Sequence, residues 1–156
     1  MPPASNNTIT FAIRPIQTED EPQWRTLWKV YCDFYQESVT ANITAHLWNR
    51  LLDSESVVRG FVAGNEAGQV FGFAHYVLHP HTWSDQTVCY LEDLFVPPQA
   101  RGQGVATSLI QHLVDTGKQQ NWRRVYWHTN TDNEAARRVY DRFTPADNYV
   151  RYTLSL

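Results

Sequence analysis

The chain has few cysteines, no long apolar run and no excess of positive charge, and each absence excludes a class of protein. Its two cysteines, Cys32 and Cys89, lie far apart and fit no metal or redox spacing, so we expect two buried free thiols. The longest apolar runs have the length of a strand, and residues 1–7 are polar, so no membrane span or signal peptide is expected. We therefore expect a cytoplasmic protein with a flexible tail at residues 1–7.

The charge pattern also limits the partners. The formal net charge is −3, and acidic and basic residues are mixed along the chain. Such a chain offers no basic face for DNA or RNA, so we expect no nucleic-acid partner and no membrane partner. His79 and His81 form the only close histidine pair and have no nearby cysteine or carboxylate ligand, so no metal site is predicted. A small cationic substrate is easier to accommodate.

What is present suits one domain over residues 1–156, because 42% of the residues are apolar and no repeat or long linker divides the chain. The apolar spacing predicts strands at 8–14, 57–63, 70–78, 87–96, 124–128 and 149–156. It predicts helices at 22–35, 44–52, 104–119 and 133–142. Successive strands followed by a β-α-β-α order indicate an α/β fold in which one mixed sheet has helices on both faces.

The segment from Arg101 to Ala106 reads Arg-Gly-Gln-Gly-Val-Ala, between a predicted strand and a predicted helix. Glycines let backbone N–H groups approach a ligand closely, and the start of a helix attracts anions, so the segment predicts a pyrophosphate site. It does not fit the dinucleotide fingerprint, because Thr107 stands at the third small position. It also lacks the lysine of a nucleotide triphosphatase loop.

Two motifs resemble those of the GNAT superfamily of N-acetyltransferases. Arg101, Gly104 and Ala106 match its acyl-coenzyme A (CoA) signature, and residues 133–140, Asn-Glu-Ala-Ala-Arg-Arg-Val-Tyr, resemble its later motif Asn-x-x-Ala-x-x-x-Tyr. The strand at 90–96 is similar to that of diamine (spermidine/spermine) acetyltransferases, and the chain's aromatic residues are similar to those of the yeast Hpa histone/polyamine acetyltransferases. The similarity is weakest in the first sixty residues, where such enzymes usually decide acceptor specificity.

The resemblance implies a mostly antiparallel mixed sheet of about seven strands with splayed central strands. It also implies acetyl-CoA as the acyl donor and a homodimer, which we expect to form through the strand at 149–156. In this fold, a backbone N–H near Phe95 stabilises the negative charge that develops during transfer. The expected cofactor-binding residues are Leu94, Phe95, Val96, Arg101, Gly102, Gln103, Gly104, Val105, Ala106, Asn133 and Ala136.

Catalysis has to remove a proton from the acceptor. An amine with a pKa near 10.4 is costly to deprotonate at pH 7, by about 4.6 kcal/mol. Glu92 is our candidate base, acting through water, and Asp93 is expected to attract the cationic substrate or to share the proton relay. Alternation along a strand sends these two side chains to opposite faces unless a bulge intervenes. Tyr140 is our candidate acid for the departing thiolate.

Other aromatic residues have simpler explanations. Trp24, Leu27, Trp28 and Tyr31 recur at helical spacing, as a buried helix face requires. Trp83, in the loop predicted at 79–85, is a better candidate for contact with the acceptor.

We therefore predict an N-acetyltransferase that moves acetyl directly from acetyl-CoA to a primary amine, with a polyamine or diamine as the leading acceptor. The lysine side chain of a protein, or an amino acid, remains an alternative acceptor. A catalytically silent acyl-CoA-binding module is the alternative function, and it predicts binding without turnover.

Overall fold

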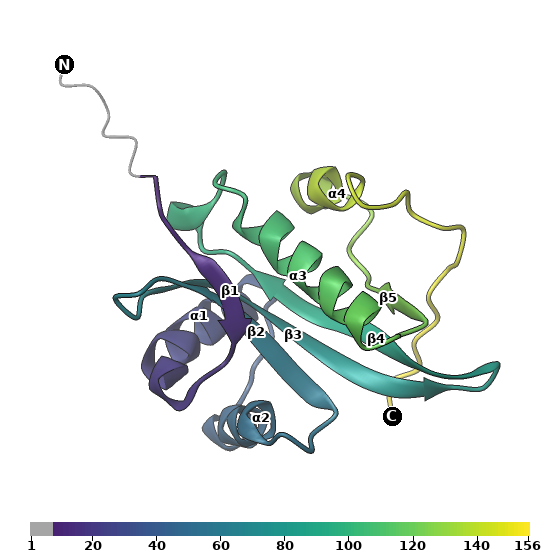
Figure 1. Ribbon diagram of the computed structural model, residues 1–156, viewed down its shortest axis with the longest axis horizontal. Coiled ribbons are helices and arrows are strands. Elements are labelled where there is room, and N and C mark those ends of the chain that lie inside the picture. Colours follow the sequence, from purple (N-terminus) through teal and green to yellow (C-terminus); the bar gives the residue numbers. More distant parts are fainter. Residues whose placement is uncertain (1–7) are drawn as a thin grey trace.

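The two faces of one central sheet carry different helices (Figure 1). The computed structural model describes residues 8–156, and the flexible tail predicted at residues 1–7 lies outside them. The sheet has the strand order β1-β2-β3-β4-β5. Its strands are β1 (Ala12–Pro15), β2 (Val58–Gly64), β3 (Val70–His81), β4 (Ser84–Phe95) and β5 (Arg124–Tyr126).

The sheet is mixed, as predicted. Strands β1 to β4 are antiparallel, and β5 lies parallel to β4. β5 pairs only with Val88–Tyr90 of β4. The rest of β4, as far as Phe95, is not paired with β5. This divergence exposes backbone N–H and C=O groups of β4 in the middle of the fold, where they need partners.

The predicted number of about seven strands is wrong, because the structure has five within residues 8–156. Residues 149–156 form no strand, and their large apolar side chains are exposed. The segment has the composition of a strand, but a strand also needs a neighbour to complete its hydrogen bonds, and none lies beside it in the described chain. The loop predicted at 79–85 is also wrong, since β3 and β4 continue to the pair His81 and Ser84.

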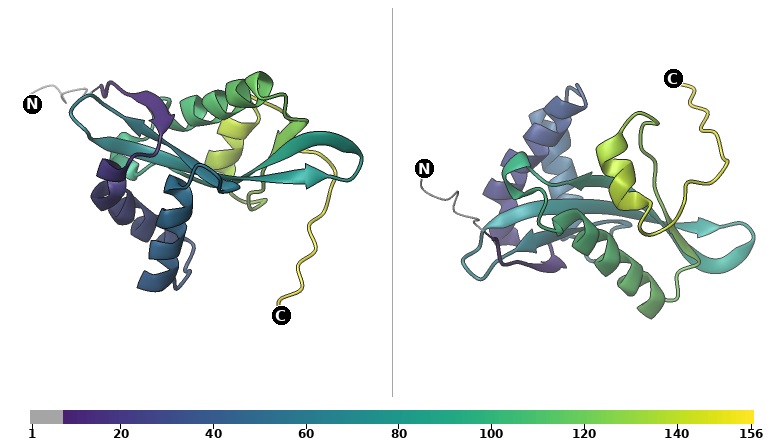
Figure 2. Two further views of the ribbon diagram at one scale, coloured as in Figure 1. Left: turned by 60° about the horizontal axis from the view of Figure 1, so that its bottom comes forward. Right: turned by 90° about the horizontal axis from the view of Figure 1, so that it is seen from above.

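Helices cover both faces of the sheet, as Figure 2 shows. On one face lie α1 (Glu21–Phe34) and α2 (Ala41–Leu52), and on the other lies α3 (Val105–Gln119). The short helix α4 (Glu134–Tyr140) follows β5. Short 3-10 turns precede α1 (Thr18–Asp20, η1) and α3 (Pro98–Ala100, η2).

The sheet separates two apolar cores. One core packs β2, β3 and β4 against α3, with Leu109 and Leu113 fully buried. The other packs the sheet against α1 and α2, and it contains Trp24 and Leu27, which confirms the buried helix face predicted for them.

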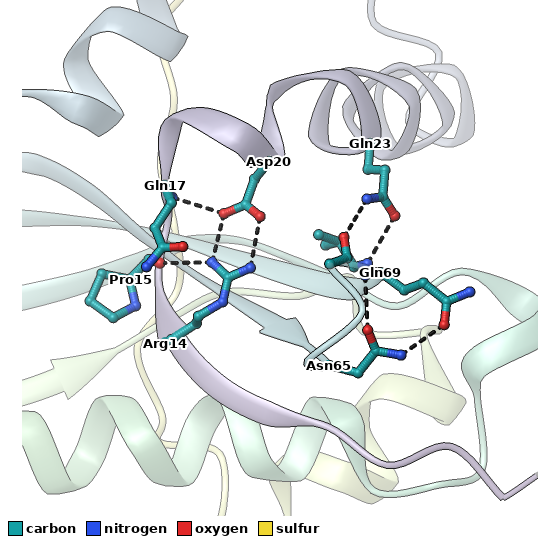
Figure 3. Close-up of polar contacts among 9 residues, drawn as sticks. Arg14, Pro15, Gln17, Asp20, Gln23, Asn65 and Gln69 are labelled. Atoms are coloured by element: carbon teal, nitrogen blue, oxygen red, sulfur yellow. Dashed lines mark hydrogen bonds and ion pairs between the residues drawn. The ribbon is translucent and has the colours of Figure 1, made fainter.

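Polar contacts fasten α1 to the end of the sheet (Figure 3). The Arg14 guanidinium makes two hydrogen bonds to the buried Asp20 carboxylate, at 2.7 and 2.8 Å. Burial opposes ionisation of Asp20, but the hydrogen bonds from Arg14 and the Gln17 backbone outweigh it and lower the Asp20 pKa. Gln23 of α1 accepts from the Val70 backbone N–H at 3.0 Å. The first helix is therefore held in place by residues of β1 and β3.

Both cysteines are buried free thiols, as predicted. Burial raises the pKa of Cys89 to about 12, so this thiol stays protonated at neutral pH and is no nucleophile. Among residues 8–156, no helix is long and apolar enough to cross a membrane. In the same residues no three potential metal-ligating side chains gather, and the absence of a metal stays a prediction.

Candidate active site

Glu92 and Asp93 of β4 line the same cleft, because the strand is bulged at Glu92. His75 of β3 pairs with Asp93, but the next residue, Tyr76, pairs with Leu91, so Glu92 is the extra residue. A bulge interrupts the alternation of side chains along a strand. The two neighbouring carboxylates therefore face one cleft of about 280 Å³ instead of opposite sides of the sheet.

The surroundings of Glu92 favour its use as a base. Burial of its carboxyl raises its pKa, and the negative charge of Asp93 raises it further. The positive charge of Arg151 acts in the opposite direction but does not reverse the shift. A carboxylate with a raised pKa accepts a proton more readily near neutral pH, which is the property that a general base requires.

Asp93 is held rigidly by two donors. Its Oδ1 accepts a hydrogen bond from the Tyr31 hydroxyl at 2.7 Å, and its Oδ2 lies 2.9 Å from Nδ1 of His75. Burial and the adjacent Asp93 charge raise the pKa of Tyr31, so that hydroxyl remains a donor. Because each carboxylate oxygen has a donor, Asp93 has one fixed orientation.

A tryptophan fixes the state of His75. The Trp24 indole Nε1–H donates to Nε2 of His75 at 2.9 Å, and both side chains are buried. An indole nitrogen only donates, so Nε2 of His75 carries no proton and the ring is neutral, with its proton on Nδ1. That proton points at Asp93. Trp24, His75, Asp93 and Tyr31 thus form one hydrogen-bonded chain, which we call the carboxylate relay.

The other wall of the cleft comes from α2. Ile43 and Leu47 contribute apolar surface, and His46 and Arg50 contribute polar groups. Residues three, four and seven positions apart share one side of a helix, which is why these α2 residues face the cleft together. The remaining lining residues are Val58 and Val77 of the sheet, with His75.

The glycine segment forms a cradle at the start of α3. Gly102 and Gly104 have φ values of 75° and 80°, a conformation that favours glycine. A Cβ added at either position would meet nothing within 4 Å, so the room beside both glycines is open. No side chain caps the helix, so the N–H groups of its first turn, including those of Val105 and Ala106, remain open to an anion. These features fit the pyrophosphate of CoA.

The polar side chains of the cradle are held by neighbouring backbone. Nε of Arg101 donates to the Val96 carbonyl at 3.0 Å, and Gln103 Oε1 accepts from the Ile9 N–H at 2.7 Å. Both bonds tie the cradle to adjacent segments of the fold. The expected cofactor residues Leu94 and Val96 lie where β4 has left β5, close to these bonds.

The second motif positions Tyr140 on α4. The Asn133 side chain accepts from the Ala136 N–H at 3.3 Å and caps α4, so these two motif positions start the helix that ends at Tyr140. The Tyr140 ring packs on Trp127, with 5.6 Å between ring centroids. Burial, and to a smaller degree the Tyr35 hydroxyl, raise the pKa of Tyr140 to about 12. Tyr140 is therefore protonated at neutral pH, and its hydroxyl can donate a hydrogen bond.

Trp83 is separate from the cleft. It lies in the turn between β3 and β4 and is 83% exposed. Glu92 lies near the other end of β4, and the residues of β4 between Trp83 and Glu92 span about 27 Å at 3.4 Å per residue. The structure brings Glu92 and Asp93 together but leaves Trp83 at the other end of the hairpin.

The sequence analysis does not predict the roles of Tyr31, His75 and Arg50. Tyr31 was assigned to a core face, and its hydroxyl contact with Asp93 depends on two segments that are far apart in the chain. His75 is a buried imidazole that contacts Trp24 on one side and Asp93 on the other. The position of Arg50 could have been found from the sequence, because helical spacing places Arg50 on the same side of its helix as Ile43 and Leu47.

Comparisons with known proteins agree with this geometry. A model of the acetyltransferase (GNAT) family matches residues 16–144. The D-amino-acid N-acetyltransferase HPA3 of Saccharomyces cerevisiae is 30% identical over 141 residues, which cover 90% of this chain and 88% of the yeast protein. The uncharacterized N-acetyltransferase YhfO of Bacillus subtilis is 29% identical over 147 residues, covering 92% of this chain and 97% of that protein.

Solved structures share the fold. The crystal structure of a probable acetyltransferase matches with a TM-score of 0.82 at 24% identity, covering 93% of this chain and 97% of the other. An aminoglycoside acetyltransferase from an uncultured soil metagenomic sample matches with a TM-score of 0.78 at 18% identity, covering 97% and 98% of the two chains.

Proposed function

Because the chain belongs to the acetyltransferase (GNAT) family, we propose that this acyltransferase moves an acetyl group from acetyl-CoA directly to the nitrogen of a small primary amine. The main support for this proposal is the bulge in β4, which directs the side chains of Glu92 and Asp93 into the same cleft. It gives the acceptor amine both a base and a negative charge. Neither cysteine lines the cleft, which favours direct transfer without a covalent enzyme intermediate.

Backbone groups hold the cofactor in this proposal. The N–H groups of Gly102 to Ala106 surround its pyrophosphate, and the backbone of Leu94, Phe95 and Val96, beyond the last β5 pair, binds its pantetheine arm as a further strand would. When bound, acetyl-CoA supplies the acetyl group as a thioester. A backbone N–H near Phe95 stabilises the negative charge that develops on the acetyl oxygen.

Glu92 and Asp93 divide the work at the amine. Asp93, with both oxygens held in place by the relay, positions a carboxylate that attracts an ammonium ion. Glu92 has no such fixed donors among the described hydrogen bonds, and its raised pKa suits it to take the proton, directly or through a water. The proton lost by the acceptor therefore passes to Glu92.

Tyr140 is the proposed donor to the departing thiolate. Its pKa of about 12 is well above the value near 8.5 of a cysteine-like thiol, so complete proton transfer from Tyr140 is uphill by roughly 4.8 kcal/mol. We propose that Tyr140 acts chiefly through a hydrogen bond to the leaving sulfur, and that the departing thiolate takes its proton from solvent.

Two classes of acceptor have support. A polyamine or diamine fits two carboxylates in one cleft. An amino acid is suggested by the yeast relative, which is named a D-amino-acid N-acetyltransferase. The lysine side chain of a protein remains a weaker alternative, because the cleft of about 280 Å³ is at the small end for ligand sites.

The direct test is acetyl-CoA consumption with release of free thiol, measured against spermidine, putrescine, amino acids and a histone-tail peptide. We expect turnover with a small amine, and a loss of about hundredfold or more in the Glu92→Gln variant. Cofactor binding without turnover on any amine would favour the silent binding module. A chain that does not bind CoA, measured by calorimetry, would overturn both functions.

Two further proposals concern the setting of the enzyme. We propose a homodimer in which residues 149–156 pair with a second copy, since Tyr149, Tyr152 and Leu154 are each at least 85% exposed. Truncation after Asn148 would then convert a dimer to a monomer in light scattering.

We also propose a cytoplasmic location, which two unpaired thiols favour. Imaging of a tagged full chain tests it.

A further inference from the structure

The cleft that holds the two carboxylates also has a cation in its wall. Arg50 and His46 of α2 line it together with Glu92 and Asp93. No ion pair or hydrogen bond among the described residues involves the Arg50 guanidinium, and Arg50 is exposed at the cleft. A guanidinium without a partner, in a cleft that also contains carboxylates, offers a ready site for a carboxylate of the ligand.

We infer that the acceptor is an amino acid, and that Arg50 is the residue that selects it by binding its carboxylate while its amine lies at Glu92 and Asp93. The inference rests on the proposed function and names the substrate class of that same cleft. The zwitterion has one charge for each kind of group in the cleft. Ile43 and Leu47, on the same side of α2, supply the apolar surface for its side chain.

A polyamine fits this cleft less well. Its charges are all positive, so its second ammonium group would lie in a small cleft with an unpaired guanidinium. Like charges in such a setting repel each other, and desolvation strengthens the effect. Arg50 thus discriminates against diamines as well as in favour of amino acids, which is how specificity commonly arises.

Arg50 has one ordinary structural explanation that the test must exclude. It lies in the last turn of α2, where a cation interacts favourably with the helix dipole. Lys118 occupies the same place in the last turn of α3, which packs on the opposite face of the sheet. Lys118→Gln is therefore a matched control, because it removes the same helix-end charge without changing the cleft.

The experiment compares Arg50→Gln, Lys118→Gln and the unchanged chain on paired acceptors. Each pair is an α- or ω-amino acid, in both enantiomers where they exist, and the amide of the same amino acid, and spermidine is measured alongside. Acid and amide differ in amine basicity, and this difference cancels when the acid-over-amide ratio of kcat/KM in a variant is divided by the same ratio in the unchanged chain. We expect Arg50→Gln to lower that ratio by about tenfold, the worth of one charge-assisted hydrogen bond. Lys118→Gln should leave it within about twofold.

Calorimetric binding of the amino acid and its amide, with no cofactor added, gives a second readout that does not need turnover. Weaker binding of the acid alone in Arg50→Gln supports the inference even if catalysis is slow. Equal effects of Arg50→Gln on acid and amide, or a chain that prefers spermidine to every amino acid, would overturn it and leave the proposed function intact. Absence of acetyl transfer to any amine, with selective binding of the acid retained, would instead count against the proposed function alone.

Discussion

The proposed cofactor side and the proposed acceptor side of this molecule differ in what forms them, backbone groups in the first and side chains in the second. The cofactor side consists mainly of backbone: two glycines with positive φ, the uncapped start of α3, and the part of β4 that β5 leaves unpaired. The acceptor side consists of side chains from α1, α2, β3 and β4. A backbone site needs a short local sequence, whereas a side-chain site needs contacts between distant segments.

This difference shows which substitutions each side tolerates. The cradle depends on glycine conformations, so its neighbours can vary as long as φ and the open helix start are kept. The acceptor side depends on individual atoms, such as the Trp24 N–H and the Tyr31 hydroxyl, and the cleft is reshaped when α2 changes. Cofactor choice should therefore be hard to change and acceptor choice easy.

The largest effect should come from the titration of Glu92. If Glu92 accepts the proton of a bound ammonium ion, kcat/KM has a plateau between the Glu92 pKa and the amine pKa. Because burial and Asp93 raise the Glu92 pKa, the acid limb should lie above the ordinary glutamate value of about 4.3. Activity is present above that pKa and falls about tenfold for each pH unit below it, or about hundredfold over two units.

The Glu92→Gln variant sharpens this measurement. Without a base, only the free neutral amine reacts, so kcat/KM should rise about tenfold per pH unit up to the amine pKa, with no plateau. Glu66→Gln, in the loop between β2 and β3, is the control and should keep the plateau. The same plateau in Glu92→Gln would assign the proton to another group.

The next largest effect tests the cofactor side through Gly104. Gly104→Ala places a Cβ at a φ of 80° and in the open space of the cradle, so we expect CoA to bind about tenfold or more weakly. Gly68 is a matched control, since it has a φ of 82° and equally open surroundings, in a loop away from the cradle. Both variants should lose about 1–2 kcal/mol of stability from backbone strain.

Calorimetric CoA titration and thermal unfolding separate the two consequences. Equal stability losses with weaker CoA binding only in Gly104→Ala would locate the cofactor at the cradle. Equal CoA binding in both variants would mean that the cradle does not contact the ligand.

The same contrast explains what the sequence could predict. The element order, the mixed antiparallel sheet and the cradle follow from local patterns, such as the spacing of apolar residues and the two glycines after β4. Whether Glu92 and Asp93 share one face could not be predicted, because the bulge depends on how β3 pairs with β4. The relay was also out of reach, since Trp24 and His75 are 51 positions apart and Tyr31 and Asp93 are 62 apart.

The strand predicted at residues 149–156 is wrong for a related reason. Residues 149–156 alternate apolar and polar side chains over part of their length, which is typical of a strand. The pattern describes a segment that can pair, but pairing requires a neighbouring edge, and the single described chain does not offer one to it. Local patterns therefore predict what a segment can form and leave its partner undetermined.

A smaller effect on activity tests the acceptor side through Trp24. Trp24→Phe keeps an aromatic ring but removes the donor to Nε2 of His75, leaving a buried acceptor unpaired. We expect stability to fall by about 1–3 kcal/mol and kcat/KM to fall about fivefold, the worth of one hydrogen bond. Trp48→Phe is the control, because Trp48 packs on Trp24 with 4.8 Å between centroids and donates no described hydrogen bond.

The pH profile distinguishes the relay from simple packing. With Nε2 free, His75 can become positively charged as pH falls, and a cation near Glu92 lowers the Glu92 pKa. The acid limb of kcat/KM should therefore move to lower pH in Trp24→Phe and stay in place in Trp48→Phe. If the acid limb of kcat/KM stays at the same pH in both variants, Trp24 contributes only to core packing.

The smallest effect should come from Trp83, at the turn between β3 and β4. The acceptor contact predicted for it requires an acceptor long enough to reach from Glu92 to the hairpin turn, about 27 Å along the strand. For small amines, Trp83→Ala should change kcat/KM by less than about twofold, and stability by about 0.5 kcal/mol at most, since the side chain is 83% exposed. A large loss on a small amine would show that Trp83 reaches the cleft from a second copy of the chain or after a movement of the hairpin. A loss confined to a long peptide acceptor would instead keep Trp83 as a distant contact, and the acceptor side would then extend well beyond the cleft that α2 and β4 enclose.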